Sequence, residues 1–153
     1  MSWFKKASKE DESAGQVSIE RVMARLASME YNVNQFGDGE PACGAYFDGV
    51  PVTFLVLNDR FLVVKGNGWF NMEASRQAEV QVKANSWNSD TWFGTAYPFS
   101  DEDGLQVLCD YSFDCEKGVT DQQIDDTIGV GISVTVQCIE QMAEELGVEV
   151  TTN

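Results

Sequence analysis

Residues 105–115 alternate between two kinds of side chain, and this pattern constrains the fold more than any other feature. Hydrophobic or sulfur-bearing side chains occupy every second position, and mostly polar ones lie between them. Such alternation is typical of a β-strand, because successive side chains of a strand point to opposite faces of its sheet. We expect one face to meet the core and the other to be largely solvated. The core-facing positions are Leu105, Val107, Cys109, Tyr111, Phe113 and Cys115.

The two cysteines of this strand do not indicate a metal or redox site. Cys109 and Cys115 are six residues apart on one face, so they would lie roughly 20 Å apart in an extended strand, too far for a disulfide bond. Asp110 and Asp114 point to the opposite face, so thiols and carboxylates do not converge on one ion. The chain has four cysteines and no CxxC pair. We interpret all four as small buried hydrophobic residues.

The pattern upstream predicts a series of helices and short strands. Ser18 has the chemistry of an N-cap for a first helix. Four β-rich runs follow, and Asn58-Asp59 marks a tight hairpin between two of them. A second helix begins near Ser75, and a further pair of strands is joined by a loop ending at Asp103-Gly104. The predicted element order is α-β-β-β-β-α-β-β-α. The six predicted strands are residues 42–47, 51–57, 60–65, 66–71, 91–99 and 105–115.

A long last helix is predicted to begin at Thr120. Thr120 and Gln123 have the form of a capping box, and an apolar stripe runs through the whole segment at helical spacing. Gly129 and Gly131 each weaken a helix by about 1 kcal/mol relative to alanine, and the residues around them also alternate as a strand would. We predict a helix because the stripe continues on both flanks and the cap is strong.

This last helix is apolar on a second side. At 100° per residue, Val130, Val134 and Cys138 fall away from the main stripe. One side would cover the sheet, and the other would need a second subunit or a bound partner, with Gly131 allowing close approach. Alternatively, the N-terminal tail or the first helix covers this side within one chain. Val130, Gly131, Val134 and Cys138 are therefore the candidate interface.

Charge and composition exclude several functions. The formal net charge is −15, and such a surface repels the phosphates of a nucleic acid. The sequence contains no histidine, so a Ser-His-Asp or Cys-His site cannot be built and the commonest general base is missing. We predict that the protein is not an enzyme and has no catalytic residues, no cofactor and no metal site.

The length of 153 residues suits one domain. We predict a tail over residues 1–15, one α+β domain over 16–148 and a C-terminal tail over 149–153. The sequence WFKK at positions 3–6 could touch a membrane or a partner. No apolar run approaches the roughly 20 residues that span a bilayer, so we expect no stable membrane insertion. The N-terminus lacks the apolar core of a signal peptide, which predicts a cytoplasmic protein.

Two short motifs resemble ligand-binding motifs, but each lacks residues that binding requires. The acids before Gly104 do not continue into the twelve-residue pattern of an EF-hand, so we interpret them as a hairpin turn. The GVG at residues 129–131 lacks the third glycine and the Lys-Ser/Thr of a phosphate loop, so packing is the better interpretation. Some aromatic side chains could line a ligand pocket, although core packing is their commoner role: Trp69, Trp87, Trp92 and Tyr97.

Residues 84–128 combine several features in one order. Asn85 and Asn88 end a helix, a strand with Ala96-Tyr97 and an acidic hairpin follow, and after the alternating strand the sequence GVTDQ at 118–122 opens a long helix. In these features the chain resembles the YbjN family of bacterial sensory transduction regulators, over about residues 17–147. The resemblance implies the α+β fold class, with an antiparallel sheet flanked by helices as in type III secretion chaperones, which are often dimeric. The predicted element order fits this fold. The family carries no established catalytic residues, so the resemblance transfers none.

Together these observations predict a non-enzymatic, cytoplasmic regulatory or interaction domain. It would bind a protein or peptide partner and act as a homodimer. The alternative is a small-ligand or metal-binding sensor domain that uses Tyr97, the tryptophans or the acidic hairpin.

Overall fold

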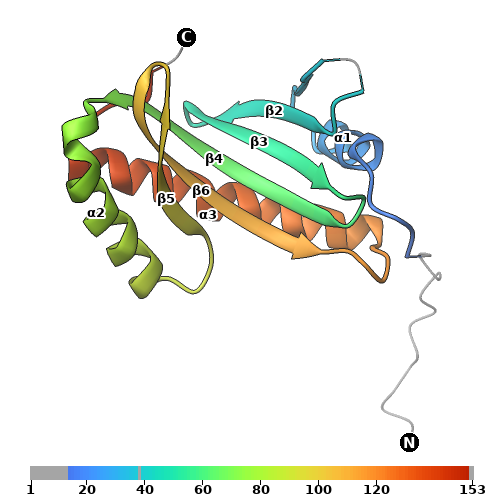
Figure 1. The fold of residues 1–153 in the computed structure, drawn as a ribbon. Coiled ribbons are helices and arrows are strands. Elements are labelled where there is room, and N and C mark those ends of the chain that lie inside the picture. Colours follow the sequence, from blue (N-terminus) through green and yellow to red (C-terminus); the bar gives the residue numbers. More distant parts are fainter. Residues whose placement is uncertain (1–13, 38, 152–153) are drawn as a thin grey trace, which may run out of the picture.

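A six-stranded antiparallel sheet organises the chain in a computed structural model that describes residues 14–37 and 39–151 (Figure 1). The strand order is β1-β2-β3-β4-β6-β5. In chain order the elements are α1 (Ile19–Ser28), β1 (Asn34–Gln35), β2 (Ala42–Phe47), β3 (Val50–Leu57), β4 (Phe61–Met72), the 3-10 turn η1 (Ala74–Arg76), α2 (Gln77–Asp90), β5 (Thr95–Asp101), β6 (Gly104–Asp114) and α3 (Asp121–Leu146).

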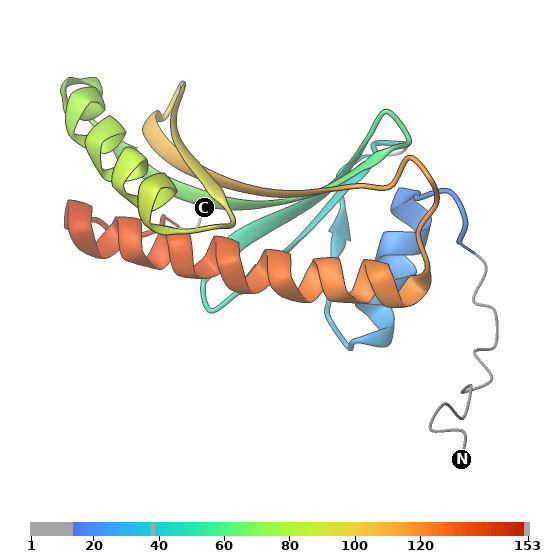
Figure 2. The same cartoon turned by 90° about the horizontal axis from the view of Figure 1, so that it is seen from below.

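The helices lie on one side of this sheet. Figure 2 shows α3 running along one face, with α1 beside its first half and α2 near its C-terminal end. Buried side chains of all three helices meet the inward-facing side chains of the strands in one core. In the described part of the chain, no helix covers the opposite face. The sheet therefore has a core face and an open face.

The predicted fold class and element order are confirmed, but one strand was assigned to the wrong residues. The run at 66–71 is not a strand of its own, because β4 continues unbroken from Phe61 to Met72. The remaining strand is β1, a two-residue pairing of Asn34 and Gln35 with β2 that has no alternation to reveal it. The predicted hairpin is present: Asn58 and Asp59 both adopt positive φ, as a tight turn between two strands requires.

The predicted α3 is confirmed together with its cap. The Thr120 hydroxyl accepts from the Gln123 amide, and the Gln123 side chain accepts from the Thr120 amide. The helix ends at Gly147 in the left-handed conformation, with φ of 65°. Ion pairs join α1 to the start of α3: Arg21 to Asp121 at 2.9 Å, Arg25 to Asp125 at 2.7 Å and Arg25 to Asp121 at 3.8 Å.

The two glycines of α3 have different surroundings. A Cβ on Gly131 would lie 2.5 Å from Cγ2 of Val64, so α3 approaches β4 too closely there for any side chain. A Cβ on Gly129 would meet nothing within 4 Å. The close approach that Gly131 permits is therefore made to the sheet of its own chain.

The second face of β6 is less solvated than the alternation predicts. Gln106 is 1% exposed and Leu108 is 7% exposed, although both point to the open face. The Gln106 side chain donates to Asn71 and Asp101 and accepts from the Asn71 amide. The expectation of a largely solvated face is wrong for this end of the strand, because neighbouring side chains on β4 and β5 cover it.

The chain ends also differ in detail from the predicted tails. The N-terminal tail lies outside the described residues except for Ala14 and Gly15, and Gly15 forms an isolated β-bridge with Val119. At the C-terminus, Val150 packs against the core and Thr151 donates to the Trp69 carbonyl at 2.8 Å. The chain therefore remains attached to the domain as far as residue 151.

Alanine substitutions at the two helix glycines should have opposite effects. Gly131→Ala should destabilise the protein by about 1–3 kcal/mol, because the new methyl group overlaps Val64. Gly129→Ala should stabilise it by up to about 1 kcal/mol, because alanine is the better helix former and the position is open. Urea unfolding of both variants measures the two changes, and equal effects would contradict the close helix–sheet contact.

Candidate functional site

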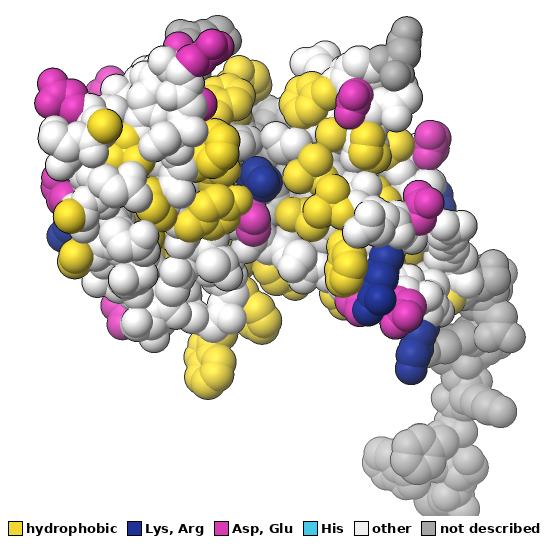
Figure 3. Space-filling model, viewed as in Figure 1, with side chains coloured by type: hydrophobic (Ala, Val, Ile, Leu, Met, Phe, Trp, Pro, Cys, Tyr) yellow, Lys and Arg dark blue, Asp and Glu magenta, His cyan; other side chains and the backbone are white. Residues whose placement is uncertain are grey.

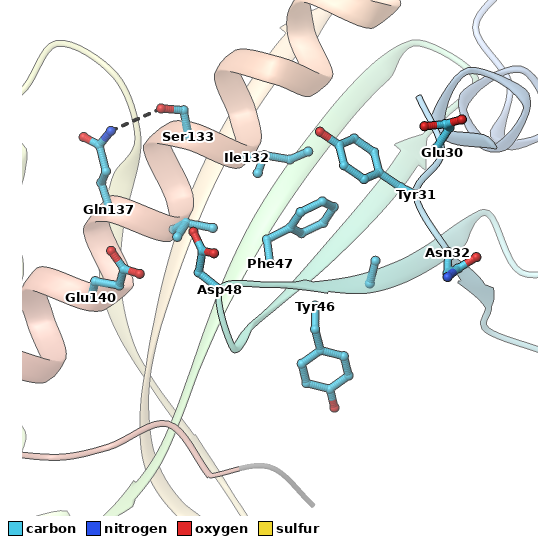
Figure 4. Close-up of a pocket in the computed structure, with 12 residues that line it drawn as sticks. Glu30, Tyr31, Asn32, Tyr46, Phe47, Asp48, Ile132, Ser133, Gln137 and Glu140 are labelled. Atoms are coloured by element: carbon cyan, nitrogen blue, oxygen red, sulfur yellow. Dashed lines mark hydrogen bonds between the residues drawn. The ribbon is translucent and has the colours of Figure 1, made fainter. Parts of the chain in front are cut away.

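A surface groove lies between the end of α1, the β2–β3 hairpin and the middle of α3. We call it the hairpin groove, and its volume is about 620 Å³. Its three borders are residues 30–32, residues 45–48 and the α3 side chains from Ile132 to Glu140. Figure 4 shows Tyr31, Phe47 and Ile132 pointing toward one another from these three borders. Tyr46 points away, to the other side of β2.

Local backbone geometry brings these borders together. The chain leaves α1 through Glu30, whose positive φ of 66° turns it so that the Tyr31 amide donates back to Leu26. Asp48 also has a positive φ, in the tight turn that joins β2 to β3. The Tyr31 ring packs edge-on against Phe47 at 5.0 Å, and Phe47 packs against Phe54 in the core at 6.2 Å. The floor of the groove is therefore apolar and supported from below.

Acidic side chains surround this floor. Glu30, Asp48 and Glu140 line the groove, one from each border, and among the described residues no lysine or arginine lines it. Further along α3, Glu144 and Glu145 continue the acidic border past Glu140. An apolar floor with an acidic rim suits a ligand that has an apolar anchor and positive charges around it.

The open face of the sheet is a second, broader surface. Figure 3 shows hydrophobic side chains spread over its strands with few charged side chains among them. Tyr46, Leu57 and Phe99 are 55%, 43% and 47% exposed on this side. Scattered exposed apolar side chains are normal on any protein surface, so this face alone does not define a site.

One polar cluster lies within the open face. The Tyr97 hydroxyl donates to Asp110 at 3.0 Å, and the Lys65 ammonium lies 3.8 Å from the other carboxylate oxygen. That second oxygen is buried and accepts no hydrogen bond. Burial raises the pKa of Asp110, although Lys65 and Tyr97 partly oppose the shift. Burial and the neighbouring carboxylate also raise the pKa of Tyr97, so its hydroxyl stays protonated and serves as a donor to Asp110.

The four aromatic candidates from the sequence lie in different surroundings, and Tyr97 belongs to the polar cluster with Asp110. Trp87 is buried, and its indole donates to the Gly94 carbonyl at 3.1 Å. Trp69 is half-buried on β4, and Trp92 is 95% exposed. Asn88 has a framework role, because its amide both donates to and accepts from the Ala96 backbone and so ties α2 to β5.

The structure separates the four residues of the candidate interface. Gly131 and Cys138 are buried against the sheet of their own chain, so the expected placement of Cys138 away from the sheet is wrong. The helix packs on β4 and β6, and Cys138 is buried there beside Cys109 of β6. Val130 is 42% exposed, and Val134 is half-buried against Gly94. Only Val130 and Val134 therefore remain available to a second copy.

Two exposed aromatic side chains lie in a loop that packs against Val134. The loop between α2 and β5 places Trp92, 95% exposed, and Phe93, 62% exposed, next to Gly94 and hence near Val134. The Phe93 ring packs edge-on against Tyr111 at 6.1 Å. We call Trp92, Phe93, Val130 and Val134 the loop patch. Sequence reasoning missed it, because the loop residues were interpreted as part of a strand.

The cysteines have the chemistry of core residues. All four are free and buried. Burial raises the pKa of Cys43 to about 11, and a hydrogen bond with Cys109 together with burial raises the pKa of Cys138. The thiols of Cys43 and Cys138 therefore stay protonated at neutral pH and are poor nucleophiles. In the residues that the structure describes, no group of three or more Cys, Asp or Glu side chains could hold a metal ion.

Comparison with known proteins decides the family. A family model described as "Putative bacterial sensory transduction regulator", YbjN, matches residues 18–144. The chain belongs to the YbjN family. The resemblance inferred from the sequence is thus confirmed, over nearly the same residues.

Solved structures agree with this YbjN-family fold. YbjN from E. coli is 13% identical, with a TM-score of 0.72, and the match covers 89% of this chain and 98% of that chain. An uncharacterized protein from Methanothermobacter thermautotrophicus is 11% identical, with a TM-score of 0.52, covering 84% and 98%. At these identities the likeness shows the fold alone.

A third similar structure is more distant from this YbjN-family chain. It is the Yersinia pestis type III secretion chaperone SycH in complex with a stable fragment of YscM2, 11% identical, with a TM-score of 0.44, covering 78% of this chain and 97% of that chain. A TM-score this low does not support any inference about partners. A search of curated proteins finds no match. Among the described helices of this YbjN-family protein, none has the length and apolar character needed to cross a membrane.

Removing the buried charge of Asp110 should stabilise the protein in a pH-dependent way. Because the folded-state pKa of Asp110 is raised, its ionisation costs stability at neutral pH and protonation removes that cost as the pH falls. Asp110→Asn should therefore unfold at a higher urea concentration than wild type at pH 7. The advantage should shrink as the pH falls through the folded-state pKa, when the wild-type carboxyl becomes neutral too.

Asp114→Asn is the matched control, and its expected effect on stability at pH 7 is the opposite of that of Asp110→Asn. The Arg60 guanidinium holds the pKa of Asp114 below its usual range, so this carboxylate stabilises the fold above its unfolded pKa. The variant should be less stable than wild type at pH 7, and the difference should vanish at acid pH. A destabilised Asp110→Asn at pH 7 would contradict the assigned cost of burial.

Proposed function

We propose that this chain is a non-enzymatic, cytoplasmic regulatory domain that binds a protein or peptide partner in the hairpin groove and acts as a homodimer. The family's description as a regulator supports the general role. The main support for this binding site is the groove itself, in which three chain segments converge on an apolar floor with an acidic rim. Four buried free thiols suit a reducing compartment and support the cytoplasmic assignment.

The chemistry of the groove specifies the partner. Tyr31, Phe47 and Ile132 would receive an aromatic or aliphatic anchor side chain, and burying such an anchor is a common source of binding energy. Glu30, Asp48 and Glu140 would meet lysines or arginines beside that anchor. The partner segment should therefore be basic with one or two large apolar residues. An acidic segment would be repelled both by the rim and by the net charge of −15.

The loop patch supports the homodimer. A Trp side chain that is 95% exposed next to an exposed Phe is unusual on a monomer surface, and both residue types are enriched where proteins meet. Two copies of a chain with charge −15 repel each other, so their contact should form where acidic side chains are absent from the seam. The four residues of the loop patch are all uncharged and apolar. Two of them, Val130 and Val134, also belong to the interface that was predicted from the sequence.

A photo-crosslinking amino acid in the groove should capture the partner in the source cell. We expect p-benzoylphenylalanine at Tyr31 to crosslink one protein, identified by mass spectrometry, whose contact segment is basic. The same amino acid at Lys83, on α2 away from the groove, serves as the control position. Adding Ile132→Asp to the Tyr31 variant should abolish the capture, because a carboxylate on the floor removes the apolar anchor site.

Two outcomes would contradict the groove as the binding site. One is equal capture of the same protein from Tyr31 and Lys83. The other is capture from Tyr31 that survives Ile132→Asp in a variant whose circular dichroism shows an intact fold.

Trp92→Ser should dissociate the homodimer without disturbing the fold. The Trp92 side chain is almost fully exposed, so its loss costs the monomer little, whereas a buried tryptophan in a seam is often worth 2 kcal/mol or more. Light scattering after gel filtration should give twice the 17.0 kDa chain mass for wild type and a single chain mass for the variant. Val82→Ser, at a 62% exposed valine on α2, is the control and should remain dimeric. A wild-type mass of one chain would overturn the dimer.

A further inference from the structure

Among the described residues, the charged side chains that line the hairpin groove are all acidic, so an occupant of the groove should supply positive charge. Three carboxylates come from three different segments, and Glu144 and Glu145 extend the same sign along α3. The apolar floor between them is large enough for an aromatic ring, because the groove volume is about 620 Å³. A cationic segment with an aromatic anchor would satisfy both features.

The sequence contains one such segment. Residues 3–9 read WFKKASK, with two adjacent aromatic residues and three lysines in seven positions. These three lysines are the densest group of positive charge in a chain with only ten basic residues. Elsewhere basic side chains are spread out, and several form ion pairs within the fold, such as Arg21 with Asp121, Arg60 with Asp114 and Arg76 with Glu79.

The attachment point of this segment places the groove within reach. Gly15 is held beside Val119 by two backbone hydrogen bonds of 3.2 and 2.8 Å, just before α3 begins. From there α1 leads toward the groove, since it begins at Ile19 and ends just before Glu30. Ten residues of helix span about 15 Å. The eleven residues from Phe4 to Gly15 span up to about 36 Å when extended, which is enough to follow α1 to the groove.

We propose that residues 3–9 dock in the hairpin groove of their own chain, with Trp3 or Phe4 on the apolar floor and the lysines at the acidic rim. This inference rests on the proposed function, because it names a regulator of the same site. A tethered segment binds with a high effective concentration, on the order of millimolar. The docked segment would therefore prevent weak or non-specific partners from binding. Only a partner that binds the groove more tightly would displace it.

The full-length chain with p-benzoylphenylalanine at Phe4 tests this docking. After illumination of the purified protein at low micromolar concentration, peptide mapping should place the crosslink within residues 30–32, 45–48 or 132–140 of the same chain. Intrachain products migrate as a single chain in a denaturing gel, which separates them from crosslinks between copies. Crosslinks to other residues, crosslinks only between copies, or no crosslink would overturn the proposal.

A pair of charge reversals tests the electrostatic part of the same contact. Glu140→Lys, on the rim, should lower the intrachain yield roughly threefold, because one exposed ion-pair interaction is lost. Glu102→Lys makes the same change of charge in the exposed β5–β6 turn, and it should leave the yield unchanged. Equal yields in the two variants would show that the rim does not hold the lysines and would overturn the proposal.

The two proposals fail in different ways. If the tail does not dock but Tyr31 still captures a partner in the cell, the groove remains a binding site and only its internal regulation is wrong. If the tail docks and no partner is captured from Tyr31, the proposed function fails while the contact of residues 3–9 stands.

Discussion

Close contact between α3 and β4 is the constraint on which the rest of the structure depends. It is made by glycine on both sides, since Gly131 of the helix faces Val64 and Gly66 of the strand faces Thr135. With no Cβ at either position, the helix can lie directly on the middle of the sheet. The core then extends along the helix in both directions, to α1 at one end and α2 at the other.

The position of α3 also creates both candidate interaction surfaces. On one side of the helix, Ile132 and Glu140 form a border of the hairpin groove with the end of α1 and the β2–β3 hairpin. On another side of the helix, Val134 lies against Gly94 in the loop between α2 and β5, and Val130 is exposed one turn before it. The groove is acidic and the loop patch is apolar and uncharged. The first therefore suits a basic segment, and the second suits a copy of the same acidic chain.

Much of the framework could be predicted from the sequence, because its signals are local. The strand at 105–115, the capping box at Thr120 and the turn at Asn58-Asp59 are each indicated by neighbouring residues, and each is present in the structure. Strand β1 could not be predicted, since two residues carry no periodicity and pair only because β2 lies beside them. The burial of Gln106 and Leu108 likewise depends on side chains that other strands supply.

The sequence by itself determined the α+β class, the order of elements, the family and the absence of histidine chemistry, because periodicity, caps, motifs and composition are written along the chain. Only the tertiary structure decided which side of α3 is free. Helical geometry places Val130, Val134 and Cys138 on one side, but the depth at which the helix lies on the sheet buries Cys138 and leaves Val130 exposed. The groove is likewise a tertiary feature, since Glu30, Asp48 and Glu140 are far apart in sequence and converge only when three segments pack together.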